Sequence, residues 1–121
     1  MLYPIDTYIF YITTKEQASN ILGSKQYEDP SLDSDGFIHF CSYGQIGNVV
    51  DSFFAGVKDL QLLIVDIKSL NSELLFEKPL GNISISNSVA QLFPHLYGPL
   101  NTDAVVNTVD FESFIKDNVA A

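Results

Sequence analysis

The sequence has no arginine, and this absence narrows what the protein can bind. Its six basic residues are all lysines and face fifteen acids, so the net charge is −9 at pH 7. Nucleic-acid binding needs clustered cations that displace counterions from phosphates, so the composition argues against nucleic acid and against an anionic membrane surface. A bound phosphate or carboxylate would lack the two-pronged guanidinium that usually holds it, and would depend on lysines, backbone N–H groups or a helix N-terminus.

Disulfide partners and long apolar runs are lacking as well. The single cysteine cannot form an internal disulfide, which predicts a reducing, cytoplasmic location. No apolar run approaches the roughly 18 residues of a transmembrane helix, and the first dozen residues lack the basic start and small-residue cleavage site of a signal peptide. What remains is a chain of 121 residues that is 46% apolar, which predicts one globular domain over residues 1–121.

Apolar periodicity predicts an α+β domain, with helices early in the chain and strands throughout. The run LQLLIVDI is almost continuously apolar, which is typical of a strand at the centre of a sheet. Strands are expected at residues 7–12, 36–40, 60–67, 72–77 and 103–111.

Capping signals place the helices. Thr13 with Glu16, and Ser42 with Gln45, each form the pattern of a capping box at a helix start. Glycines at 23 and 56 predict the ends of these two helices, and residues 111–118 predict a closing helical turn. Loops are expected at 24–35, at 78–92 with a short strand at 82–85, and at 93–100 as a rigid aromatic loop between two prolines.

The stretch DGFIHFCSYGQ contains the cysteine and one of the two histidines. Side chains alternate across a strand, so His39 and Cys41 are expected on one face with Phe40 on the other. A cysteine beside an imidazole can act as a thiolate nucleophile. More often, a free cysteine packs as a small hydrophobic side chain, and this structural reading competes with the catalytic one.

The second histidine, His95, lies in the expected loop between Pro94 and Pro99. Loops on a scaffold often carry binding residues, which favours a site here. Alternatively, the two prolines stiffen a turn in which His95 and Tyr97 satisfy neighbouring backbone groups. Glu77, at the end of its strand, is either a charge on the rim or a carboxylate that points into a cleft.

A metal site is the remaining chemical alternative. Zinc could be held by His39, Cys41 and His95 with either Glu77 or Asp35. Asp35 precedes a glycine, however, and suits a local turn. Because paired spacings such as C-x₂-C or H-E-x-x-H are absent, no metal is predicted.

Four stretches taken together resemble a known family. SLDSDGFIHFCSYGQ, FFAGVKDLQLLIVDI, LLFE and FPHLYGPLNTDAVV occur in this order in the family called domain of unknown function 952. The resemblance runs from about residue 8 to 109 and leaves 110–121 as a C-terminal tail. It implies a fold like that of ADP-ribosyltransferases: a split, bent β-structure with two or three short helices, whose central cleft binds nicotinamide dinucleotide in active relatives.

The resemblance also implies a set of site residues. Catalytic roles would fall to His39, Glu77 and His95, and ligand contacts to Tyr11, Thr13, Cys41, Ser42, Gln45, Tyr97 and Gly98. The family usually has serine where this chain has Cys41, so a thiolate is not expected to be required. Phe76 replaces a common tryptophan, and no arginine is present to clamp a pyrophosphate.

Three functions are consistent with these features. The first is a small domain that binds a small, nucleotide-like ligand without catalysis, in a cleft shared by the two histidine motifs. The second, implied by the resemblance, is an NAD-dependent ADP-ribosyltransferase or RNA 2′-phosphotransferase, in which Glu77 would stabilise positive charge on the ribose carbon. The third is a hydrolase built on cysteine and histidine, or a metal site. Nucleic-acid and membrane partners are not expected.

Overall fold

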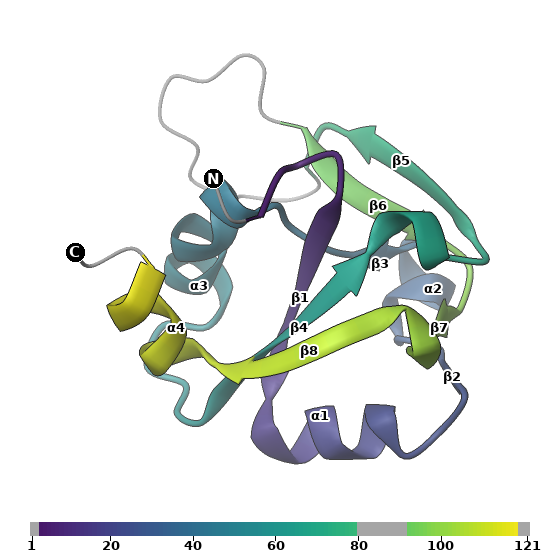
Figure 1. The fold of residues 1–121 in the computed structure, drawn as a ribbon. Helices are drawn as coiled ribbons and strands as arrows, with labels where there is room; N and C mark the ends of the chain where they lie inside the picture. Colours follow the sequence, from purple (N-terminus) through teal and green to yellow (C-terminus); the bar gives the residue numbers. More distant parts are fainter. Residues whose placement is uncertain (1–2, 80–91, 119–121) are drawn as a thin grey trace.

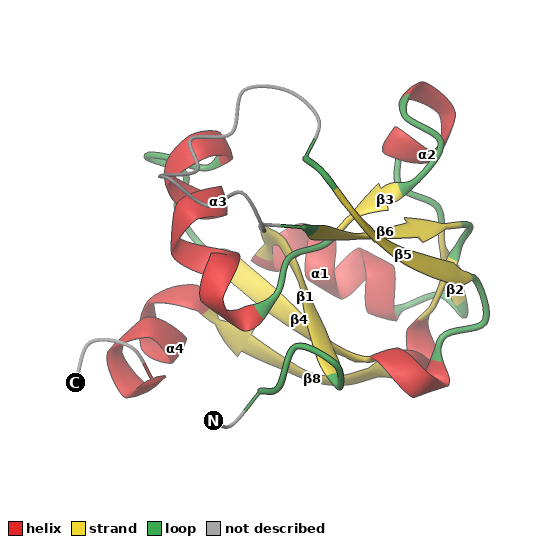
Figure 2. Cartoon of the chain, turned by 90° about the horizontal axis from the view of Figure 1, so that it is seen from above, coloured by secondary structure: helices red, strands yellow, loops and turns green. Residues whose placement is uncertain are grey.

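The computed structural model describes residues 3–79 and 92–118, and within them eight strands form three small antiparallel sheets beside four α-helices (Figure 1 and Figure 2). The first sheet has the order β1-β4-β8, the second pairs β2 with β7, and the third has the order β3-β6-β5. The strands are β1 (Tyr8–Thr14), β2 (Gln26–Tyr27), β3 (Ile38–His39), β4 (Leu60–Asp66), β5 (Glu73–Glu77), β6 (Phe93–Tyr97), β7 (Leu100–Asn101) and β8 (Val105–Asp110). The helices are α1 (Lys15–Leu22), α2 (Ser31–Ser34), α3 (Ile46–Phe53) and α4 (Phe111–Asn118). This architecture confirms the predicted α+β class.

Strands β1 and β4 of the first sheet are buried on both faces, which explains their nearly unbroken apolar sequences. On one face, alternate residues of β1 and β4 pack with α1 and with the third sheet. The intervening residues pack on the opposite face with α3 and α4. Figure 1 shows this arrangement, with α3 and α4 on one side of β1 and β4 and the third sheet on the other. The prediction that residues 60–67 form a central strand is therefore confirmed by β4.

The first and third sheets meet where the chain leaves β3. The Phe40 N–H donates to the Pro94 carbonyl of β6 (3.0 Å), whereas the next residue, Cys41, exchanges two backbone hydrogen bonds with Phe10 of β1 (2.9 and 2.7 Å). The backbone thus changes partner sheet within one step. Phe40 packs with Ile38 and Leu96 on one side of the first sheet and Cys41 packs with Phe10 on the other, while His39, Phe40 and Cys41 all border the same cavity.

The capping signals are accurate to within one residue. Ser42 and Gln45 form the predicted capping box, which opens a short 3₁₀ turn that runs into α3. At α1 the cap is Thr14 rather than Thr13, because β1 stays paired with β4 through Thr14. The Thr14 hydroxyl accepts from the Gln17 N–H (3.2 Å). The helix predicted for residues 111–118 is present as α4.

The prediction of a loop at 93–100 is wrong, because residues 93–97 form β6 in the middle of the third sheet. A proline in a central strand normally removes a ladder hydrogen bond. Here the Pro94 carbonyl accepts a hydrogen bond from the Phe40 N–H. The carbonyl and the nitrogen of a residue in an antiparallel strand face the same neighbour, so the missing N–H of Pro94 faces Phe40, just after β3 has ended at His39. The short length of β3 therefore makes Pro94 compatible with the sheet.

Two smaller expectations differ as well. The region 24–35, predicted as a loop, contains the two-residue strand β2 and the single-turn helix α2. The short strand expected at 82–85 lies outside the described residues. None of the helices in the described ranges has both the length and the hydropathy needed to cross a membrane.

Candidate ligand-binding cleft

A cavity of about 560 Å³ lies at the junction of the first and third sheets. Its two ends differ in chemistry. Apolar side chains from β1, α3 and β6 form one end: Phe10, Ile12, Val49, Phe53, Phe54 and Phe93. Polar side chains gather at the other end: Tyr11, Asp29, Asp35, His39 and His95. Phe40, Cys41 and Pro79 complete the lining among the described residues.

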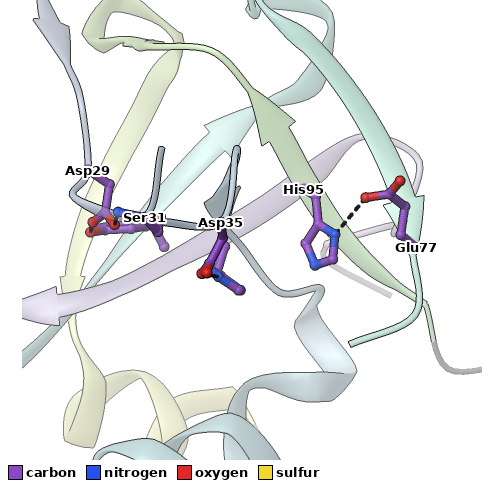
Figure 3. A network of polar contacts seen from close by, with 7 residues as sticks. Asp29, Ser31, Asp35, Glu77 and His95 are labelled. Carbon is purple, nitrogen blue, oxygen red and sulfur yellow. Dashed lines mark hydrogen bonds and ion pairs between the residues drawn. The ribbon is translucent and has the colours of Figure 1, made fainter. Parts of the chain in front are cut away.

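The two histidines face each other at the polar end because β3 and β6 pair in the register His39↔His95. Their ring centroids are 5.5 Å apart and the rings meet edge to face. Each imidazole has its own carboxylate partner. His39 Nε2 lies 2.7 Å from an oxygen of Asp35. His95 Nδ1 lies 2.8 Å from an oxygen of Glu77, and Figure 3 shows this second pair.

Local backbone geometry places the Asp35 carboxylate against the ring of His39. Asp35 closes the single turn of α2, and the next residue, Gly36, has a φ of +88°. This left-handed conformation suits glycine, and it turns the chain back into β3. The sequence predicts a local turn at Asp35, and this turn positions the Asp35 carboxylate against the ring of His39, four residues later.

His95 is buried by the ring of Phe37. The two rings stack with centroids 3.9 Å apart and planes 20° from parallel, and the His95 side chain is only 2% exposed. Burial lowers the pKa of His95, and this effect outweighs the raising influence of Glu77. Phe37 was missed as a site residue, although its spacing two residues before His39 places both side chains on one face of an extended chain.

The partners of His95 fix where its proton sits. Hydrogen bonds from Tyr97 and from His95 lower the pKa of Glu77, so Glu77 is an acceptor at neutral pH. The Tyr97 hydroxyl donates to the same Glu77 oxygen at 2.6 Å, and this bond raises the pKa of Tyr97. His95 in its neutral form therefore carries the proton on Nδ1 and a lone pair on Nε2. Figure 3 shows Nε2 on the side of the ring away from Glu77.

A second polar group in the cavity wall surrounds Asp29. Its carboxylate accepts hydrogen bonds from the hydroxyls of Tyr11 and Tyr27 and from the Ser31 N–H (2.9 Å). Burial alone would raise the pKa of Asp29, but these hydrogen bonds outweigh it and lower the pKa. Burial, followed by the bond to Asp29, raises the pKa of Tyr11, so its hydroxyl stays protonated. The family resemblance implied Tyr11 as a ligand contact, whereas Asp29 and Tyr27 lie in the loop expected at 24–35 and were not predicted as site residues.

The structure separates the predicted site residues into three groups. Tyr11, His39, Cys41 and His95 line the cavity. Glu77 and Tyr97 are outside the lining and reach it only through His95. The four remaining predictions, Thr13, Ser42, Gln45 and Gly98, are not among the lining residues.

Local contacts account for three of these four residues. Ser42 and Gln45 serve the capping box, and the Gln45 amide also donates to the Leu92 carbonyl at 2.8 Å. Gly98 lies at a close approach, because a Cβ atom there would stand 2.5 Å from the Ser72 hydroxyl oxygen. Their predicted role in ligand binding stays a prediction.

Cys41 has the environment of a packing residue. Its side chain is 2% exposed, and burial raises the pKa of its thiol well above the usual range. A raised pKa disfavours the thiolate that a nucleophile needs. Among the described residues, no group of three or more His, Cys, Asp or Glu side chains is close enough to hold a metal ion.

The fold and the cleft define an α+β domain in which two antiparallel sheets meet along a cavity with paired histidines. The chain belongs to the family described as "Protein of unknown function (DUF952)", which matches residues 12–108. This confirms the family expected from the sequence. No curated protein matches the chain.

Solved structures of protein CC0527 from Caulobacter crescentus have a similar fold. The crystal structure is 28% identical, with a TM-score of 0.70, and the match covers 86% of this chain and 85% of that one. A crystal structure of its double mutant is 27% identical, with a TM-score of 0.69 and the same coverage. The solution structure of CC0527 is 27% identical, with a TM-score of 0.67, and the match covers 85% and 83% of the two chains.

Proposed function

We propose that the protein binds a small, partly apolar organic molecule in the cleft, with the two histidines as its main polar contacts, and that it does not change the ligand covalently. The cavity volume of about 560 Å³ falls within the range of about 300–1,000 Å³ that is usual for small-molecule sites. We place this function in the cytoplasm, since the one thiol of the chain is buried and free.

One observation carries this proposal. The imidazole of His95 is almost fully buried, yet its Nε2 has no hydrogen-bond partner among the described residues and the residue lines the cavity. Among the described residues, Ser31 Oγ is the fully buried side-chain atom without a partner, so His95 Nε2 is not sealed in the interior but opens onto the cavity. The fold thus holds an acceptor in place and leaves its bond to whatever occupies the cavity.

Binding without catalysis is favoured because the described lining residues include neither an activated nucleophile nor a free donor for an oxyanion. Cys41 is not activated, and Glu77 is outside the lining. The described polar side chains at the cavity also offer no free donor for developing negative charge, since the Tyr11 hydroxyl is already bonded to Asp29.

A dinucleotide is the second candidate ligand, and with it the chemistry of ADP-ribosyltransferases. The family resemblance implies a split, bent β-structure with a central cleft, and the two three-stranded antiparallel sheets that meet along the cavity are compatible with it, which supports this candidate. Against it, none of the described lining residues is a lysine, and both lining carboxylates would repel a diphosphate. We therefore rank it below binding of an uncharged or cationic ligand.

Imidazole ¹⁵N NMR tests the proposed function directly. Uncharged aromatic fragments are screened, and hits are expected to shift the ring nitrogens of both His39 and His95. In the variant His95→Phe, which keeps a ring to stack on Phe37, hits should bind at least about tenfold more weakly. The control Asp51→Asn, on the exposed side of α3, should bind as the parent does. Hits that shift neither histidine, or no hits at all, would contradict the proposal.

A further inference from the structure

The polar end of the cleft has a uniform hydrogen-bonding character. The lone pair of His95 Nε2 is an acceptor, and so are the carboxylates of Asp29 and Asp35. Asp35 lies 2.7 Å from Nε2 of His39, and a His39 ring that donates from Nε2 alone has its lone pair on Nδ1. Among the described lining residues, the one side-chain hydroxyl is that of Tyr11, and it donates its hydrogen bond to Asp29.

The charge of the lining has a single sign. Two carboxylates border the cavity, and no lysine is among the described lining residues. An anionic head group would therefore meet repulsion and find no partner, whereas a donor would find several acceptors. Carboxylates alone would not define a site, but the almost fully buried imidazole of His95 holds an unpartnered nitrogen in the same cavity.

The opposite end of the cavity accepts an apolar group. Val49, Phe53 and Phe54 from the end of α3 border it together with Phe93. Phe53 is 56% exposed, so this end is open at its rim. Aromatic side chains at such a rim fit flat or extended hydrocarbon.

We propose that the cleft selects amphipathic amines: molecules with a protonated amino head group, which donates to the histidine and carboxylate acceptors, and an apolar body that lies against the phenylalanines of α3. This inference rests on the proposed function and adds the chemical class and the orientation of the ligand. Charge-assisted hydrogen bonds are stronger than neutral ones, so the ammonium form is the best head group and a carboxylate the worst.

Three probes with one tail and different head groups test the ligand class: 4-phenylbutylamine, 4-phenylbutanol and 4-phenylbutyrate. Calorimetric titrations are run at pH 8, above the ordinary imidazole pKa of about 6.5. The amine is expected to bind at least about tenfold more tightly than the carboxylate, with the alcohol between them, because each charge-assisted bond gained is worth about that factor.

A pair of variants separates contact in the cleft from overall charge. Asp35→Asn removes one of the two lining charges and keeps a side-chain oxygen that can accept from His39. The ratio of the Kd of the carboxylate to the Kd of the amine should fall at least about threefold in this variant. Asp33→Asn removes the same charge from an exposed position of α2 outside the lining, and should leave the preference unchanged. Melting temperatures of both variants show whether they fold.

Each outcome decides one claim. Equal or tighter binding of the carboxylate would overturn the amine preference while leaving a ligand cleft intact. An equal effect of the two aspartate variants would also overturn it, since the preference would then come from net charge. If none of the three probes binds, the proposed function itself is contradicted.

Discussion

His95 owes its chemistry to three neighbours that come from separate parts of the chain. Glu77 on β5 fixes its tautomer, Phe37 covers its ring, and His39 faces it across the strand pair. The sequence singled out His39, Glu77 and His95, because histidines in aromatic motifs and a carboxylate at a strand end are conspicuous. It could not pair them, since a tautomer or a stacked ring depends on contacts between residues far apart in sequence.

The buried state of His95 predicts how stability depends on pH. Burial lowers its pKa in the folded protein below the unfolded value of about 6.5. The unfolded chain then binds more protons, so stability is fully present above about pH 6.5 and is lost as the pH falls through the folded pKa. We expect the free energy of unfolding, measured with urea, to decrease between pH 7.5 and 5.5.

His95→Phe is the matched variant for this effect, because it keeps the stacked ring and removes the titrating group. The decrease in unfolding free energy over this pH range should be smaller in the variant. Glu77, whose pKa is also lowered, contributes to a separate loss of stability at a lower pH, below its ordinary value of about 4.5. An identical pH slope in the two proteins would show that His95 is not the group responsible.

At the level of elements, local signals sufficed for helices and failed for the strand that carries the site. Capping boxes and glycines are read within four residues, so α1 and α3 were placed within one to three residues of their bounds. Pro94 and Pro99 instead predict a loop where the chain forms β6. Its strand character depends on pairing with β5, from Glu77↔Phe93 to Glu73↔Tyr97, and on the early end of β3. Such non-local pairing leaves no local sequence pattern.

The turn that follows β6 predicts a sensitive glycine. Gly98 has a φ of +152°, and a Cβ atom there would lie 2.5 Å from the hydroxyl oxygen and 2.9 Å from the Cβ of Ser72. The Ser72 hydroxyl also donates to the Pro99 carbonyl (2.8 Å), so it cannot move freely. Gly98→Ala should therefore lower the free energy of unfolding by roughly 1–3 kcal/mol.

Gly47→Ala is the control for Gly98→Ala. Gly47 is an exposed residue of α3, and a Cβ atom there meets nothing within 4 Å. Alanine is the better helix former, so this variant should gain about 0.5–1 kcal/mol. Urea unfolding of both variants measures the two signs, and a neutral Gly98→Ala would mean that the turn after β6 adapts.

At the scale of the whole molecule, composition and cleft point in the same direction. The sequence alone shows the net charge of −9 and the lack of arginine. It does not show that the carboxylates of Asp29 and Asp35 border the cavity, because their positions depend on the turn at Gly36 and on the two tyrosines that hold Asp29. The long-range field and the local lining therefore both oppose anionic ligands.

This agreement predicts weak binding of nicotinamide dinucleotide, with a Kd of about tens of micromolar or weaker, because each missing charge-assisted bond removes about 1.5–3 kcal/mol. Salt screens the repulsion, so the affinity should improve when the salt concentration is raised. Nicotinamide riboside, a cation without the diphosphate, is the matched ligand: it should bind more tightly than the dinucleotide and lose affinity as salt is added. Calorimetric titration of both at low and high salt measures these opposite trends. Submicromolar binding of the dinucleotide at low salt would require a cationic site that the lining does not contain, and would favour the ADP-ribosyltransferase-like function instead.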